Sequence, residues 1–308
     1  MTLLSDKPVR KPFILNKKEE HILQAVHFLE CVTVQEITRL LFATGSRNHV
    51  GAILRKLSGG RDYDDQEFLY RFPLPTAARG TKERVYCLGA KAREVLAIED
   101  APRASKLRYL SYSPILHDLM LSRFLTAATT YFAAHTDYDL LETRTCYQLA
   151  RNPPLIEVNT HGKKATIAVI PDAWLYIERV EEGTAYPLWL EIDRGTENRQ
   201  KFQQLVRNRL ALVRSRQYKH LFHTQAVLLC YVSVGATPAL AQTRLHHMLR
   251  WTDDVISEQP KKERQKWAAL FRFTTVEFEN MYEHTHTLLE EPVWYKPNVS
   301  DPVPLFSK

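Results

Sequence analysis

The sequence predicts an α+β or α/β protein, in which an N-terminal winged helix-turn-helix is followed by a mixed-sheet domain. Three observations support this fold class. Three amphipathic helices and a hairpin fill the first hundred residues, and apolar β-branched runs alternate with long helices after residue 114. Residues 1–110 carry an excess of six positive charges, whereas the rest of the chain carries an excess of one. A length of 308 residues allows two domains.

The first two helices are predicted from apolar spacing and capping residues. Residues 18–30 place apolar side chains on one helical face. Thr33 followed by Glu36 is a capping-box pattern, which predicts that a second helix begins there. A third helix is expected from about Ser46. Its apolar residues have the spacing i, i+3, i+4, i+7 (Val50, Ile53, Leu54 and Leu57).

The third helix has a basic free face. Arg47, Asn48 and Arg55 lie on it, and His49 and Lys56 flank it. Two short helices joined by a tight turn, with the second basic on its free side, are the layout of a helix-turn-helix. We therefore expect this helix to enter the major groove of double-stranded DNA.

A hairpin is predicted after the third helix. Strands are expected at residues 67–72 and 83–88, and Arg79 and Lys82 lie in the Pro/Gly loop between them. This loop resembles a wing whose basic tip contacts the DNA backbone, with Arg84 beside it. Residues 15–98 are thus predicted to form a winged-helix DNA-binding domain. The alternative is a winged helix that contacts only proteins.

The remainder is predicted to be a linker at 99–113, an α/β domain at 114–291 and a C-terminal tail at 292–308. The mixed sheet is expected from the alternation of strands and helices. The predicted helices are 115–134, 196–218 and 238–257, and the predicted strands are 138–142, 164–170, 173–177, 187–192, 226–234 and 271–278.

Three carboxylates are predicted to meet at one edge of this sheet. Asp172 follows an apolar strand, and strand alternation places Glu191 and Asp193 on the same side of the next strand. Carboxylate oxygens are the ligands that Mg²⁺ and Mn²⁺ prefer. Lys201 and Arg207 on the following helix would neutralise a phosphate. The alternative is structural, with Asp172 capping a turn and Asp193 paired with Arg194.

This arrangement resembles the core of the PD-(D/E)xK nucleases. Pro171-Asp172 and Glu191 match the metal-binding positions of that motif. The resemblance implies catalytic roles for Asp172, Glu191 and a lysine, with Mg²⁺ or Mn²⁺ as the cofactor, and the position of Asp193 beside them makes it a further catalytic candidate. Asp193 stands where the family has its lysine, so Lys201 is the candidate replacement.

The order of elements over most of residues 17–235 resembles the replication-relaxation family of bacteria and their plasmids. The most specific parts are RVYCLGAKAREVL, His117 in ILHDLML, PDAWL and LEIDRGTE. This resemblance implies a role in the replication, nicking, relaxation or mobility of plasmids and other mobile elements. It also implies partners in a DNA-processing complex.

Other classes of function fit the sequence poorly. It contains no P-loop motif, no GxGxxG and no GxSxG elbow. Without a membrane segment or a signal peptide, we expect a cytoplasmic protein. Two hypotheses stay open. One is a metal-dependent DNA endonuclease. The other is a non-catalytic regulator or initiator whose C-terminal domain binds proteins or forms a homodimer.

Overall fold

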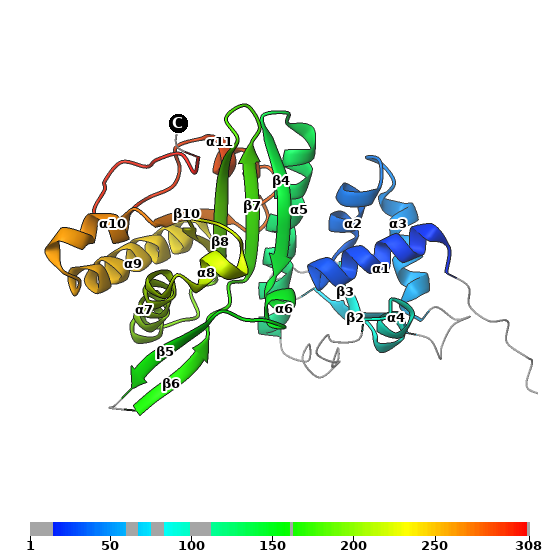
Figure 1. Ribbon diagram of the computed structural model, residues 1–308. Coiled ribbons are helices and arrows are strands. Elements are labelled where there is room, and N and C mark those ends of the chain that lie inside the picture. The colour runs from blue at the N-terminus through cyan, green and yellow to red at the C-terminus, as the bar shows by residue number, and fades with distance from the viewer. Residues whose placement is uncertain (1–14, 60–66, 75–82, 99–111, 161–162, 307–308) are drawn as a thin grey trace, which may run out of the picture.

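The computed structural model has an α+β fold with a five-stranded mixed sheet. It describes residues 15–59, 67–74, 83–98, 112–160 and 163–306. A smaller N-terminal unit lies against a larger C-terminal unit that is built on this sheet (Figure 1). None of the helices in these ranges is long and apolar enough to cross a membrane.

The N-terminal unit follows the predicted order of helices and hairpin. Its elements are α1 (Lys17–Leu29), β1 (Cys31–Val32), α2 (Val34–Leu41), α3 (Arg47–Leu57), β2 (Leu69–Pro73), β3 (Arg84–Leu88) and α4 (Ala90–Val95). The three strands form an antiparallel sheet in the order β1-β3-β2. Capping boxes at Asn16 and Thr33 begin α1 and α2. The predicted wing loop, with Arg79 and Lys82, lies outside the described residues.

The C-terminal unit begins with the long buried helix that the sequence predicts. Its main elements are α5 (Tyr112–Ala134), β4 (Tyr138–Thr145), β7 (Ala173–Arg179), β8 (Thr184–Asp193), α7 (Arg199–Ser215), β9 (Leu228–Gly235), α9 (Pro238–Ser257) and β10 (Phe271–Glu277). The strand order is β10-β9-β8-β7-β4. Strands β8, β9 and β10 run parallel to one another, whereas β4, β7 and β8 pair antiparallel, so the predicted mixed sheet is confirmed.

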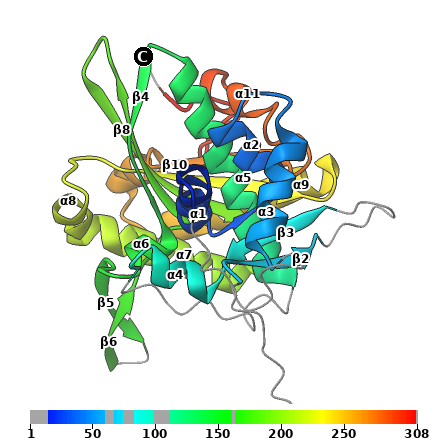
Figure 2. The same ribbon diagram turned by 90° about the vertical axis from the view of Figure 1, so that its right-hand side faces the viewer.

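The sheet is the middle of three layers. Helix α5 packs on one face, with the N-terminal unit beyond it, and α7 and α9 pack on the other face (Figure 1 and Figure 2). Strand β8 alternates accordingly: Leu188, Leu190 and Ile192 join the core on the α5 side, and Trp189 joins the core under α7 and α9. By this alternation, Glu191 and Asp193 lie on the same side as Trp189.

Several elements were not predicted from the sequence. The strand predicted at 164–170 is β6 (Lys163–Ala168), but its partner β5 (Leu155–Thr160) was missed. The hairpin that these two strands form projects from the body, because it pairs only with itself (Figure 1). Short helices were also missed: α6 (Cys146–Leu149), α8 (Gln217–Leu221), η2 (Lys261–Glu263), α10 (Arg264–Ala268) and α11 (Thr285–Glu290).

The segment predicted as a tail packs onto the C-terminal unit. Trp294 is fully buried and donates a hydrogen bond from Nε1 to the carbonyl of Leu288. Its backbone pairs with Val303, and Tyr295 pairs with Phe273 of β10. The aromatic ring of Phe306 lies 4.9 Å from that of Tyr138. Residues 292–306 are therefore an integral part of this unit.

The two units share one hydrophobic core. A single cluster of buried apolar side chains runs from α1, α2 and α3 through α5 to the sheet. A buried polar group lies in the same contact: Glu36 of α2 accepts a hydrogen bond from the Tyr282 hydroxyl and pairs with Arg123 of α5 at 3.3 Å. Arg39 also lies over the Tyr282 ring, 4.0 Å from its centroid. These contacts hold α2 in a defined position on α5, and α3 packs on α2.

Candidate functional site

The first candidate site is a basic groove on the N-terminal unit. It encloses about 650 Å³ between α3 and the strands β2 and β3. Its lining residues are Val34, Arg47, Asn48, Gly51, Arg55, Arg71, Glu83, Arg84 and Tyr86. Four of these nine are arginines, so the groove suits a polyanion.

The arginines converge on Tyr86, a buried residue in the middle of β3. Burial raises the pKa of Tyr86, whereas the charges of Arg71, Arg55 and Arg84 act in the opposite direction. These cations come from three elements, α3, β2 and β3, which only the folded hairpin brings to one surface. All three side chains are exposed and therefore free to meet a ligand.

The structure brings together four of the residues that the sequence predicted for DNA binding: Arg47, Asn48, Arg55 and Arg84. Two others have different surroundings. Lys56 pairs at 2.7 Å with the buried Glu19 of α1, and the exposed His49 packs edge-on against Phe42 rather than lining the groove.

The sequence analysis missed Arg71 and Glu83 as groove residues. Arg71 is an exposed residue in the middle of β2, next to half-buried neighbours on both sides. This alternation is a signal that places it on the solvent side of the hairpin. Glu83 directly precedes β3, and its position in the groove follows only from the pairing of the two strands.

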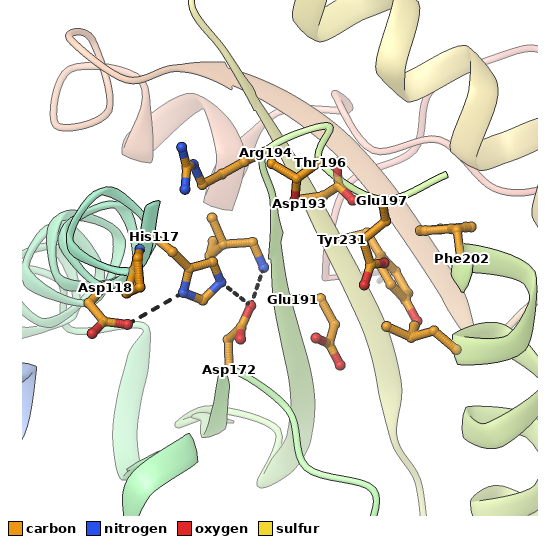
Figure 3. Close-up of a pocket in the computed structure, with 13 residues that line it drawn as sticks. His117, Asp118, Asp172, Glu191, Asp193, Arg194, Thr196, Glu197, Phe202 and Tyr231 are labelled. Atoms are coloured by element: carbon orange, nitrogen blue, oxygen red, sulfur yellow. Dashed lines mark hydrogen bonds and ion pairs between the residues drawn. The ribbon is translucent and has the colours of Figure 1, made fainter. Parts of the chain in front are cut away.

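The second candidate site is a pocket of carboxylates at the edge of the large sheet. It encloses about 470 Å³ beside the end of β8, between α5 and the start of α7 (Figure 3). Its ionisable side chains come from α5, β8, β9 and the loops next to the strands: His117, Asp118, Asp172, Glu191, Asp193, Arg194, Glu197 and Tyr231. Carboxylates are the most numerous of these groups.

Asp172 is held by a hydrogen-bond network at the start of β7. One of its oxygens, Oδ2, lies 3.2 Å from His117 Nε2 and accepts a hydrogen bond of 2.7 Å from the backbone amide of Ile192 (Figure 3). Nδ1 of His117 lies 3.5 Å from Asp118. Burial alone lowers the pKa of His117, but the hydrogen bonds to Asp118 and Asp172 outweigh it and raise this pKa to about 10. His117 is therefore an imidazolium at neutral pH.

Glu191 is buried and paired with an arginine from α7. Its Oε1 accepts hydrogen bonds from Arg209 and from the Trp189 indole at 2.8 Å. Burial raises the pKa of Glu191 to about 7. Arg209 opposes this shift, and the negative charge of Asp172 adds to it. Every hydrogen bond that the structure gives Glu191 reaches Oε1, and those of the Asp172 side chain reach Oδ2, so one oxygen of each carboxylate remains available.

Asp193 pairs with an arginine of α9 rather than with Arg209. Arg244 of α9 donates two hydrogen bonds of 2.7 Å to its two oxygens, and the amide of Gly195 donates a third. The sequence analysis had offered Arg194 as the partner of Asp193. Instead, the two-pronged guanidinium contact comes from a helix 51 residues away. Asp193 thus links β8 to α9.

Lys201 does not line the pocket. It is exposed in the first turn of α7, where its backbone amide donates to the capping side chain of Asn198. Arg207 is also absent from the lining and pairs with Glu258, which caps the C-terminal end of α9. Among the described residues, no three His, Cys, Asp or Glu side chains form a group that could hold a metal ion. Asp172, Glu191 and Asp193 do line the same pocket, so their use as metal ligands stays a prediction.

Several charged residues that line the pocket or pair with its carboxylates were not used in the sequence analysis. His117 was noted only as part of a family motif, and Arg209, Arg244 and Glu197 were not singled out. Glu197 lies between Asp193 and Tyr231 (Figure 3), and burial raises its pKa. A signal for Arg209 was present, because α7 contains several cations and no acid.

The fold and these two sites define a two-unit α+β protein with a cationic groove and a carboxylate pocket. Comparison with known families identifies it further. The sequence model of the replication-relaxation family matches residues 23–226, about two thirds of the chain, and the protein belongs to that family. Membership suggests a role in replication or plasmid relaxation. The comparisons with curated proteins and with solved structures found no match.

Proposed function

We propose that this protein binds double-stranded DNA through the groove between α3 and the β2–β3 hairpin. The observation that carries the proposal is the convergence of four arginines from three elements on one hollow surface. Arginine binds phosphate oxygens and guanine edges in fixed geometry, so this set suits a DNA backbone with bases beside it. The helix-turn-helix and hairpin order supports the same proposal, with α3 as the helix that enters the major groove.

The test compares two double variants of equal charge. Arg55→Ala/Arg84→Ala removes two groove cations, and Arg199→Ala/Arg207→Ala removes two exposed cations of α7. We expect the groove variant to bind a fluorescent duplex more weakly, and the slope of log K against log salt to become shallower by roughly 1.8, because two phosphate contacts are lost. The α7 variant should resemble the wild type. If both variants lose the same affinity, the groove is not the binding site.

A second candidate function is metal-dependent phosphodiester hydrolysis at the carboxylate pocket. Its supporting observation is that Asp172 and Glu191 repel each other there, which adds to the raised pKa of Glu191. A divalent cation between their available oxygens would relieve this repulsion. Mg²⁺ is commonly held by one or two carboxylates together with water and substrate phosphates, so these two residues fit it.

In this interpretation Asp172 and Glu191 are the metal ligands, and Asp193 is a structural ion pair. A divalent cation there would polarise a phosphodiester oxygen and lower the pKa of a water molecule. His117 orients Asp172, and Arg209 orients Glu191, each by a hydrogen bond to one carboxylate oxygen. Lys201 would need to reach the substrate from outside the pocket lining.

The test is metal-dependent stability together with nicking of supercoiled DNA. Mn²⁺ at a hundredfold excess over its Kd should stabilise the wild type by about 2.7 kcal/mol. Asp172→Asn should lose this stabilisation and any nicking. The control is Asp254→Asn, which removes the carboxylate that pairs with Arg199, and it should keep both. If wild-type protein binds DNA but shows neither effect, it is a non-catalytic regulator or initiator.

A further inference from the structure

A single acid lies among the arginines of the groove. Glu83 is the one carboxylate that lines it within the described ranges. Its Oε1 is 3.5 Å from the guanidinium of Arg47, and the side chain is only 21% exposed. This oxygen is buried and accepts no hydrogen bond. A buried oxygen with an electrostatic neighbour but no donor is poorly satisfied in the free protein.

Arg47 is also poorly placed for the stability of α3. It is the first residue of the helix, where the partial positive charge of the helix end disfavours a cation. Its side chain is 65% exposed, and an exposed ion pair at 3.5 Å contributes little. Neither helix stability nor the ion pair therefore accounts for Arg47, and its position at the start of α3 leaves it free to move to a ligand.

A G·C base pair satisfies both of these groups at once. In the major groove, guanine presents two acceptors that match a guanidinium, and cytosine presents an amino group that donates to a carboxylate. A phosphate, in contrast, attracts Arg47 and repels Glu83. Glu83 thus favours contact with a G·C base pair and opposes contact with the phosphate backbone alone.

We propose that Arg47 and Glu83 form a specificity pair, which is exchanged for a G·C base pair when cognate duplex DNA enters the groove. This inference rests on the proposed DNA-binding function. Glu83 lies beside Arg47 in the free protein and opposes binding to DNA that offers only its backbone. At a cognate site, Arg47 turns to guanine and the uncovered Glu83 accepts a hydrogen bond from cytosine.

The experiment compares Glu83→Gln with Glu94→Gln, which removes an exposed acid of α4 away from the groove. Both variants lose one negative charge, so a general charge effect cancels. Glu83→Gln should bind random-sequence duplex roughly fivefold more tightly, because one carboxylate near the backbone is gone. Its salt slope should steepen by roughly 0.9, because Arg47 can then contact a phosphate without an acid beside it that repels the phosphate.

Selection from a randomised duplex library supplies the second readout. Wild-type protein should enrich a G·C pair at one position, and Arg47→Ala and Glu83→Gln should each lose that preference. Glu83→Ala repeats the test in case the amide keeps part of the contact, and melting curves confirm that each variant is folded.

The outcomes separate the two proposals. If the wild type binds DNA through the arginines but Glu83→Gln keeps the same preference and affinity as Glu94→Gln, the specificity pair is wrong and the DNA-binding function stands. If the wild type binds no duplex DNA at low salt, both proposals are wrong.

Discussion

The contact between the two units offers a prediction whose size follows from the structure. Arg123 is 3% exposed and pairs with Glu36, which is fully buried. Arg123→Met removes the cation but keeps most of the side-chain volume. The carboxylate of Glu36 then retains only the hydrogen bonds from Tyr282 and from the amide of Thr33. An uncompensated buried charge of this kind costs about 3–5 kcal/mol of the free energy of unfolding.

Replacing Glu36 should lower the free energy of unfolding by less than replacing Arg123, and the effects of the two replacements should not be additive. In Glu36→Gln the amide oxygen still accepts the hydrogen bonds, and Arg123 still donates to the carbonyl of Phe278. We expect about 2–3 kcal/mol for this change. The double variant leaves no unpaired charge, so its loss should fall below the sum of the single losses by about 2 kcal/mol or more. Arg199→Met, which removes an exposed pair with Asp254, should cost less than about 1 kcal/mol.

Urea unfolding with two probes measures these losses and locates them. All five tryptophans lie in the C-terminal unit, so their fluorescence reports that unit, whereas far-UV circular dichroism reports the helices of both. The wild type should give coincident transitions, because the two units share one core. In Arg123→Met part of the dichroism change should precede the fluorescence change. Additive losses, or coincident transitions in every variant, would refute this account of the contact.

Three further changes test other parts of the structure. Burial lowers the pKa of His27, and Arg93 and Arg151 act in the same direction. The unfolded chain therefore binds a proton that the folded chain resists, and denaturant titrations should show wild-type stability falling below about pH 6.5 more steeply than that of His27→Gln. Trp294→Ala should cost about 3–5 kcal/mol in the same assay, because this ring is fully buried; a loss under 1 kcal/mol would show that the last segment is not docked. Gly235→Ala should lower the free energy of unfolding by about 1–3 kcal/mol, because a Cβ there would lie 2.6 Å from the amide nitrogen of Ala241. At Gly51 a Cβ has room, so Gly51→Ala should stabilise α3 by about 0.5–1 kcal/mol.

The elements that could be predicted from the sequence are those with local signals. The capping box of Thr33 and Glu36 begins α2 as predicted, and the expected helix at 238–257 is α9 itself. The strand at 155–160 was missed. It pairs only with the strand that follows it. The alternation of Ile156 and Val158 with Glu157 and Asn159 was a strand signal that the sequence analysis did not use.

The pocket could be predicted only in part. Strand alternation correctly placed Glu191 and Asp193 on one side of the sheet, but it carries no information about which helix covers that side. Arg209 and Arg244 reach the two acids from 18 and 51 residues away, and His117 reaches Asp172 from 55 residues away. These partners depend on tertiary packing, and they change three apparently equivalent carboxylates into one structural ion pair and two candidate ligands.

The central claim is that duplex DNA lies against α3 and the β2–β3 hairpin, and amide hydrogen exchange with and without DNA tests it most directly. The claim predicts that DNA slows exchange in Arg47–Leu57, Leu69–Pro73 and Arg84–Leu88. The projecting hairpin of β5 and β6, and α10 on the far side of the sheet, should exchange at the same rate in both states (Figure 1). Protection that is confined to the C-terminal unit, with α3 and the hairpin unchanged, would contradict the claim.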